Sequence, residues 1–278
     1  METLTFFREQ NQKNLKVRKT KAPGASSPAR TVARILGGLA LLYVLQGCMP
    51  CYYAPSSQNV PLFTEKNEFN GSAGLKLGAY SQGFDMQLAY APTDHLGLTA
   101  GYSGFRAKQS AFALDEDYSD RFRSNAFDLG MGYYTKFSKY GVFETYAGYG
   151  TGSLSNDYSG SGSSRLGHSS FFLQPALGLH TKHVQIAFSL RYRLVNYTKV
   201  KVGYSGNEYD TKFLFNLKND PLVSFLEPAF TGRFGGKSVK FQVQVCYSFL
   251  LKEGPTMSYD PFHLNLGLVF TVGGKKKL

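Results

Sequence analysis

The chain has 278 residues with 31 Lys and Arg against 19 Asp and Glu, a formal net charge of +12. Eight of these cations but only two of the acids precede Cys48, so the remaining 231 residues carry a net charge of +6 with no basic stripe, which argues against binding of nucleic acid. The mean hydropathy of −0.24 is that of a soluble chain, but a transmembrane β-barrel would not raise it because only alternate residues face lipid.

Residues 1–47 have the layout of a bacterial export signal. The apolar run Ile35–Leu45 follows Arg30, Arg34 and a longer basic stretch. A helix that crosses a bilayer needs roughly 20 apolar residues, so this run is too short to span one. A basic segment, a short apolar segment and a small residue, here Gly47, together predict cleavage.

The residues Leu45-Gln46-Gly47-Cys48 resemble the lipobox of bacterial lipoproteins. The resemblance implies that the Cys48 sulfur takes a diacylglycerol, that the preceding bond is cut, and that the new amine is acylated by a fatty acid such as palmitate. We therefore expect lipid attachment at Cys48 and a lipidated N-terminus and linker over residues 48–67. The alternatives are a plainly cleaved signal, an uncleaved anchor, or a redox pair with Cys51. A zinc site would lack ligands, because the only other cysteine is Cys246.

From Glu68 onward, apolar and polar residues alternate, which is the pattern of β-strands. Phe188 and Leu190, for example, alternate with Arg191 and Arg193. Several segments are as long as the ~9–11 residues that a tilted membrane strand needs. Ten segments alternate, namely residues 74–80, 83–90, 95–102, 126–137, 142–149, 171–180, 184–194, 223–233, 239–250 and 262–270.

The two faces of these segments distinguish a membrane barrel from a soluble one. One face carries large Phe, Tyr, Leu and Val, and the other is rich in Gly, Gln, Ser and charged residues. Such bulk would overfill a small interior but suits lipid, with a polar, filled lumen behind it. Four cations and four acids are then expected in the lumen, where they could pair: Lys76, Asp85, Asp128, Glu144, Arg191, Arg193, Glu227 and Lys240.

The connections between segments alternate in length. Long polar links at residues 107–122, 152–168 and 196–222 follow the third, fifth and seventh segments, whereas the intervening links are short. Short turns on one rim and long extracellular loops on the other are typical of outer-membrane barrels. We therefore predict an all-β fold, an antiparallel up-and-down transmembrane β-barrel of about ten strands (eight being possible) over residues 68–272, with a basic tail at 273–278. A lipid-anchored soluble β-sandwich or periplasmic barrel is the alternative.

Two short motifs echo catalytic sites. Asp94-His95 falls in a predicted periplasmic turn, the wrong rim for a surface protease. His168-Ser169-Ser170 falls at the outer end of the sixth segment, but no carboxylate follows in this strand or the next. We therefore expect no catalytic residue, no cofactor-binding or metal site, and no enzyme activity.

The export signal, the entry segment 56–74 and the strand pattern together resemble the lipid-anchored outer-membrane β-barrel proteins of Gram-negative bacteria. The resemblance implies a location in the bacterial outer membrane, in contact with its lipid. It also implies a structural or surface-interaction role, in which the long loops meet an envelope or extracellular protein. A narrow channel or transporter component is the alternative function, and an outer-membrane hydrolase is a third.

Overall fold

A computed structural model describes residues 51–79, 81–110, 119–158, 162–203, 208–251 and 257–273. The chain divides after Leu45 into two units, and all of these residues belong to the second, Gln46–Leu278. The export signal, Cys48 and residues 274–278 of the tail therefore lie outside the described residues.

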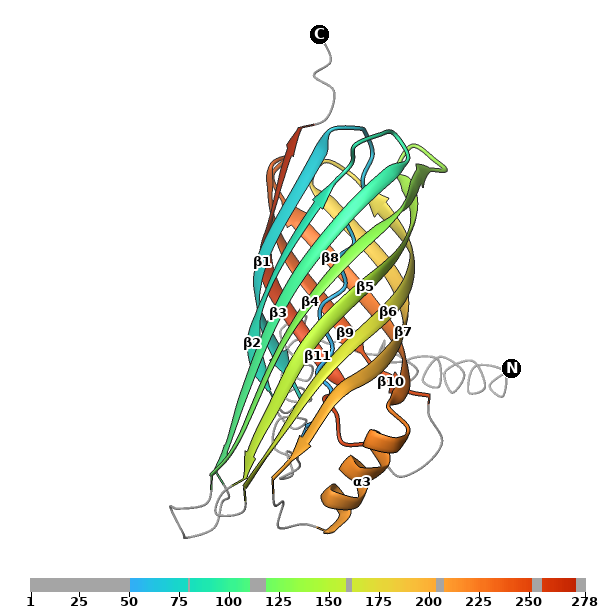
Figure 1. The fold of residues 1–278 in the computed structure, drawn as a ribbon. Helices are drawn as coiled ribbons and strands as arrows, with labels where there is room; N and C mark the ends of the chain where they lie inside the picture. Colours follow the sequence, from blue (N-terminus) through green and yellow to red (C-terminus); the bar gives the residue numbers. More distant parts are fainter. Residues whose placement is uncertain are drawn as a thin grey trace, which may run out of the picture. The chain divides into compact units, whose positions relative to one another are not determined.

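Ten antiparallel strands form a closed barrel in the described part of the chain (Figure 1). They are β1 (Glu68–Gly78), β2 (Gln82–Tyr90), β3 (Leu96–Ser110), β4 (Ser119–Lys136), β5 (Gly141–Tyr158), β6 (Gly162–His180), β7 (Val184–Val202), β8 (Leu222–Gly235), β9 (Val239–Tyr247) and β11 (Phe262–Gly273). Strand β11 closes the ring by pairing with both β1 and β9. The two-residue strand β10 (Phe249–Leu250) pairs with β8 outside this ring. The predicted ten-stranded up-and-down barrel is confirmed, and the eight-stranded form is wrong.

Apolar side chains cover the outside of the barrel, and polar side chains fill its lumen. On β7, Phe188 and Tyr192 are 55% and 43% exposed, whereas Arg191 and Arg193 are each 2% exposed. Successive strand residues point to opposite faces, so the sequence alternation produces this arrangement directly. All eight charges expected in the lumen are at most 9% exposed, as predicted. We call the band of exposed apolar side chains the belt.

Several strands are longer than a membrane crossing requires. Strands β3 to β7 have 15 to 19 residues, against ~9–11 for a tilted crossing. Beyond the belt the character of the two faces is exchanged. On β7, Asn196 and Thr198 are exposed and Val195 and Tyr197 are buried. This part of the wall therefore has the polar outside and apolar inside expected of a protein in water.

The expectation of long loops at residues 107–122, 152–168 and 196–222 is wrong for most of their length. Residues 107–110, 119–122, 152–158, 162–168 and 196–202 belong to strands. Their Ser, Gly and Asn residues suggested loops because the outward face here meets water instead of lipid. The range 196–222 also contains a helix that was not expected, α3 (Glu208–Asn219). Among the described residues, no helix is long and apolar enough to cross a membrane.

The two rims of the barrel differ. One rim carries α3, and we call it the mouth (Figure 1). The opposite rim carries the four short turns at residues 91–95, 137–140, 181–183 and 236–238. The predicted sorting of short and long connections therefore holds in part. Residues 111–118 separate β3 from β4 and residues 203–221 separate β7 from β8, but only residues 159–161 separate β5 from β6, which is no longer than a short turn.

Candidate functional site

The lumen is occupied by the chain's own N-terminal segment, residues 51–63, which we call the plug. All of its residues except Asn59 are buried. Cys51 packs with residues of α3 at the mouth, and Asn67, just beyond the plug, bonds to Ala91 at the rim with the short turns. The plug therefore runs the length of the barrel before β1 begins (Figure 1). The sequence predicts a linker here but not its passage through the lumen.

Side chains of the lumen satisfy much of the backbone of the plug, which belongs to no strand; at the mouth, Tyr52 and Tyr53 also bond to the backbone of Ser258 and Asp260. The Asn156 amide donates to the Cys51 carbonyl oxygen at 3.1 Å and accepts from the Cys51 N–H at 3.3 Å. The Gln244 amide likewise donates to the Gln58 carbonyl oxygen at 2.8 Å and accepts from the Gln58 N–H at 2.9 Å. Each amide side chain thus imitates the edge of a neighbouring strand. Because unpaired buried backbone groups are costly, these pairs hold the plug extended in one register.

A network of buried charges joins the barrel wall to the plug. Arg193 donates to both carboxylate oxygens of Asp128, at 2.9 and 2.7 Å, and Arg191 pairs with Glu227 on the neighbouring strand. Ser56 of the plug makes three hydrogen bonds in this network, one of them from Arg193 to its hydroxyl at 3.1 Å. Its hydroxyl donates to Asp128, and its carbonyl oxygen accepts from Arg191 at 2.6 Å. Buried charges are tolerated when they are paired and hydrogen-bonded, and here the plug supplies part of that bonding.

A second charged pair lies further around the lumen. Lys76 is 3.2 Å from Asp85 and donates to the carbonyl oxygen of Pro55 at 2.7 Å. The Ser57 hydroxyl donates to Asp85 at 2.7 Å. Six of the eight charges that the sequence analysis placed in the lumen are therefore paired there, as expected from their equal numbers.

The plug is fixed at the rim with the short turns by a strained residue. Leu62 has a φ of 54°, a left-handed conformation that costs an ordinary residue about 1–2 kcal/mol. Its N–H donates to Glu144 at 2.9 Å, and its carbonyl oxygen lies 2.8 Å from Nδ1 of His180. Its side chain belongs to a buried cluster with Val60 and Val142. Glu144 is in none of the ion pairs among the described residues, and it holds this end of the plug instead.

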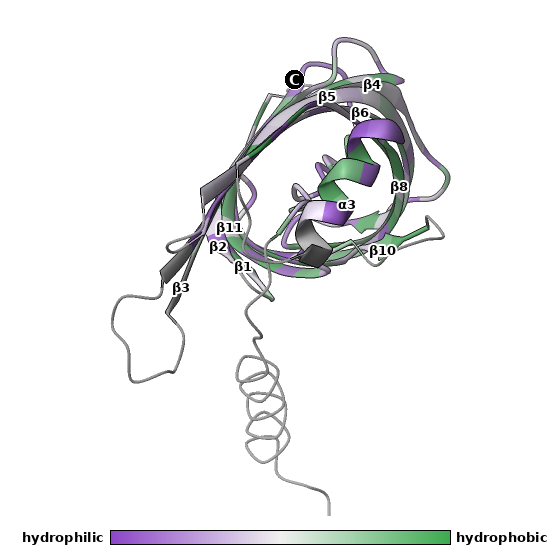
Figure 2. Ribbon diagram, turned by 60° about the horizontal axis from the view of Figure 1, so that its bottom comes forward, coloured by the Kyte–Doolittle hydropathy of each residue, from purple (hydrophilic) through white to green (hydrophobic). Residues whose placement is uncertain are grey.

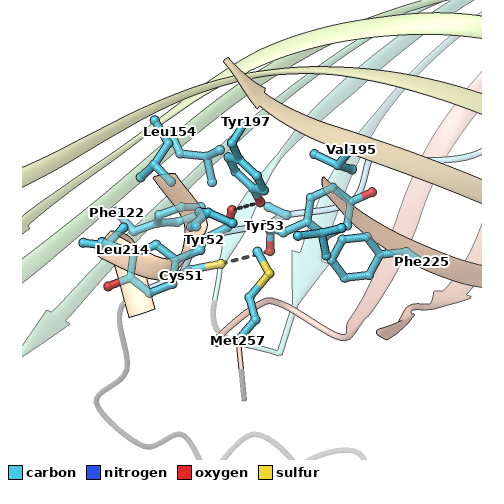
Figure 3. Close-up of a cluster of buried hydrophobic side chains, with 14 of the residues drawn as sticks. Cys51, Tyr52, Tyr53, Phe122, Leu154, Val195, Tyr197, Leu214, Phe225 and Met257 are labelled. Atoms are coloured by element: carbon cyan, nitrogen blue, oxygen red, sulfur yellow. Dashed lines mark hydrogen bonds between the residues drawn. The ribbon is translucent and has the colours of Figure 1, made fainter. Parts of the chain in front are cut away.

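An apolar cluster closes the mouth. Helix α3 lies across this opening (Figure 2), and its Leu214 and Leu217 are 0% and 3% exposed. They share the cluster with Tyr52 and Tyr53 of the plug (Figure 3). Tyr53 also stacks on Phe225, with ring centroids 4.0 Å apart. The helix therefore covers the plug with Leu214 and Leu217, and its other side, which carries Lys212 and Asn216 but also Phe215, is exposed.

Cys51 is a buried member of this cluster. Its thiol donates to the Tyr53 carbonyl oxygen at 3.1 Å (Figure 3). Burial raises the pKa of the Cys51 thiol well above its ordinary value, and the nearby charge of Asp260 adds to the effect. A reactive cysteine needs an accessible thiolate, so this environment does not favour a redox role. Cys48 is the expected lipid-attachment site and, in the alternative hypothesis, the redox partner of Cys51. It lies outside the described residues.

The cavity that the described residues leave beside the plug is small. A cavity of about 20 Å³ is lined by Ser57, Asn59, Thr99 and Gln174, among others, which is room for about one water molecule. In the part of the chain that the structure describes, no group of three or more His, Cys, Asp or Glu side chains could hold a metal ion.

The residues that echoed a hydrolase motif are placed separately. His168 points into the barrel and is 6% exposed, with its ring 5.9 Å from that of Tyr197. The Ser170 hydroxyl bonds to Arg193 at 2.9 Å, and Ser169 lies on the other face of the strand. No hydrogen bond among the described residues joins His168 to either serine. The arrangement is therefore that of lumen side chains supporting the charged network.

Three charged residues that are buried in the described part of the chain were not expected from the sequence, namely Glu68, Arg233 and Asp260. Arg233 is 4% exposed in the lumen, where it donates to Gln242 at 2.7 Å and to Gln185 at 3.2 Å. The alternation on β8 puts Arg233 on the same face as Glu227, so the pattern contained the signal.

Neither a family model nor a curated protein matches the chain. Among solved structures, it is similar to the outer membrane protease OmpT from Escherichia coli, with 11% identity, 75% of this chain and 94% of that chain covered, and a TM-score of 0.39. It is also similar to the translocator domain of the autotransporter NalP from Neisseria meningitidis, with 9% identity, coverage of 87% and 95%, and a TM-score of 0.38. The attachment invasion locus protein Ail of Yersinia pestis gives 11% identity, coverage of 74% and 99%, and a TM-score of 0.31. Likeness at this level transfers no residue role and no activity.

Proposed function

We propose that this chain is an outer-membrane β-barrel lipoprotein, closed by its own plug, with a structural or surface-interaction role at the mouth. The membrane location is supported by the belt, since a ring of exposed Phe, Leu, Tyr and Val around a polar lumen is stable in lipid and unstable in water. A soluble barrel would have the opposite arrangement, with its large apolar side chains inside.

The plug is the observation that favours a closed barrel over a channel. Its backbone and side chains bond to the lumen wall along the whole barrel, and the cavity beside Ser57 and Asn59 holds about one water. In planar bilayers, the purified protein should therefore show no steady conductance. A stable open level in the wild-type protein would overturn this proposal and favour the channel hypothesis. Ser56→Asp puts a second carboxylate beside Asp128 and should loosen the plug. This variant is the positive control for the detection of an open barrel.

The plug also gives the proposed anchor a direction. Cys48 precedes Cys51 by three residues, a span of at most about 11 Å, and Cys51 is fixed at the mouth. An acyl group on Cys48 would therefore leave the barrel on the side of α3. Longer connections are extracellular in outer-membrane barrels, so the mouth faces outward and the lipid lies in the outer leaflet. In this proposal the N-terminus reaches the cell surface through the barrel.

Labelling of intact cells tests this direction. An epitope inserted after Met49 should bind antibody on intact cells, because it emerges at the mouth. The same epitope inserted at Gly236, in a short turn of the opposite rim, should bind only after the outer membrane is permeabilised. The reverse pattern, or labelling of both sites on intact cells, would contradict the proposed path.

We assign the protein no catalytic activity in this proposal. Ser170 is bonded to Arg193 and His168 is buried, which supports a structural role for both. The hydrolase hypothesis predicts lipid or peptide cleavage that is lost in His168→Ala, and detection of such activity would replace the structural proposal.

A further inference from the structure

The outward surface of the barrel between the belt and the mouth is basic. Among the residues of β3 to β7 whose side chains the structure describes, six exposed cations point outward there: Arg106, Arg121, Arg123, Arg165, Lys199 and Lys201. Among the same described side chains, the acidic residue on this surface is Asp157, which is half-buried and directly opposite Arg121. We call these six cations the basic face.

The pairing register brings like charges together on this face. Arg106 is directly opposite Arg123, and Arg165 is directly opposite Lys201. Directly opposite side chains have Cβ atoms about 4.5–5.5 Å apart, and like charges at such positions destabilise a sheet. No salt bridge among the described residues joins any of these four cations to a carboxylate. An external anion bound between the two cations of each pair would offset this repulsion.

The two like-charged pairs belong to one row across the sheet. Ser155 on β5 is opposite both Arg123 and Arg165, so the row runs without interruption from β3 to β7. Neighbouring strands are about 4.8 Å apart, which puts the centres of the two pairs about 14 Å from each other. The row therefore offers two anion positions at a fixed spacing, with a hydroxyl donor between them.

The depth of the row identifies the anion. Tyr102 and Phe127 are exposed aromatic residues at the edge of the belt, and Arg106 and Arg123 each lie four residues beyond them. Four strand residues span about 13 Å, and the tilt of the strands reduces the height above the belt to about 10 Å. Side chains at this height reach the polar headgroups of the leaflet next to the mouth.

We propose that the basic face binds the phosphate groups of anionic lipid headgroups in this leaflet. Arg supplies a planar fork of donors that matches a phosphate, and paired cations bind it more strongly than one. The inference rests on the proposed membrane location, but binding in detergent micelles tests it separately from membrane insertion.

The test uses the full-length protein in micelles of a neutral detergent and diphosphorylated lipid A as the probe. Bound lipid is counted by native mass spectrometry, and its effect on stability is followed by heat-dependent mobility on a gel. Lipid A should bind and raise the unfolding temperature, whereas dephosphorylated lipid A and inorganic phosphate should do neither. The double substitution Arg123→Gln with Arg165→Gln removes one cation from each pair and should weaken binding by about thirtyfold.

A matched variant on the other rim controls for net charge. Lys182→Gln with Lys237→Gln removes two exposed cations from the short turns and should leave the binding of lipid A unchanged. Equal weakening in both double variants, or equal binding of the dephosphorylated lipid, would overturn the inference. Stronger binding of heparin than of lipid A would also overturn it, because it would indicate a soluble polyanion as the partner.

Discussion

Removal of Arg193 tests whether the charged network holds the barrel and plug together. Asp128 is 9% exposed, and in Arg193→Met it loses two hydrogen bonds from a guanidinium, each worth about 1.5–3 kcal/mol. It keeps the Ser56 hydroxyl and the Arg191 guanidinium, which is 4.0 Å away. Removing one partner of a buried ion pair typically costs 3–5 kcal/mol, so we expect the free energy of unfolding to fall by about 3–5 kcal/mol.

Urea unfolding in phospholipid vesicles measures this loss, and a second substitution isolates the pair. Asp128→Leu combined with Arg193→Met removes both charges, so the double variant should be less destabilised than the sum of the single variants by about 2–3 kcal/mol. Lys240→Met is the control, since Lys240 is buried in the lumen and bonds to the Lys237 carbonyl oxygen, and should cost only about 1 kcal/mol. Additive losses in the double variant, or an equal loss in the control, would refute the role assigned to the pair.

Three further predictions concern the belt, the mouth and the anchor. Phe188→Arg puts a charge in the belt on β7 and should lower the free energy of unfolding by about 2–4 kcal/mol. Asn196→Arg, beyond the belt on the same face, should lower it by at most about 1 kcal/mol. Heat-dependent gel mobility compares the two variants, and equal effects would argue against membrane insertion. Leu214→Ala empties part of the cluster under α3 and should lower the free energy of unfolding by about 2–5 kcal/mol, with faster hydrogen exchange in the plug as the measurement. Mass spectrometry should find Cys48 acylated at the N-terminus of the exported protein, and an unmodified Cys48 would disprove the anchor. The variant Cys48→Ser should remain in the membrane without the acyl chains, because the barrel itself inserts.

The strands, their order and their two faces could be predicted from the sequence alone. A strand has a side-chain period of two, so Phe188 and Arg191 are assigned to opposite faces by counting. The lumen position of Lys76, Asp128 and Glu227 followed from the same rule. These properties are local, since they depend only on residues a few positions apart.

The extent of the strands was harder to predict. Within the belt the apolar residues of the alternating pattern point outward, whereas beyond the belt they point inward. Near Val195 and Tyr197 the apolar residues point inward, and the outward ones are polar. A segment that changes character in this way looks like a loop when only apolar bulk is counted. The environment outside the wall, lipid or water, determines which pattern is stable, and it becomes visible only in the assembled barrel.

The plug could not be predicted, because residues 51–63 have no periodicity and contain Pro55 and Pro61, which lack an N–H for a strand ladder. The partners of this segment are distant in the chain. Gln58 bonds to Gln244, which is 186 positions away, and the two meet only because the ring of strands closes around the segment. A backbone that is satisfied by side chains of the wall carries no local signal of its place. The tertiary structure alone therefore determines that the barrel is filled by its own N-terminal segment.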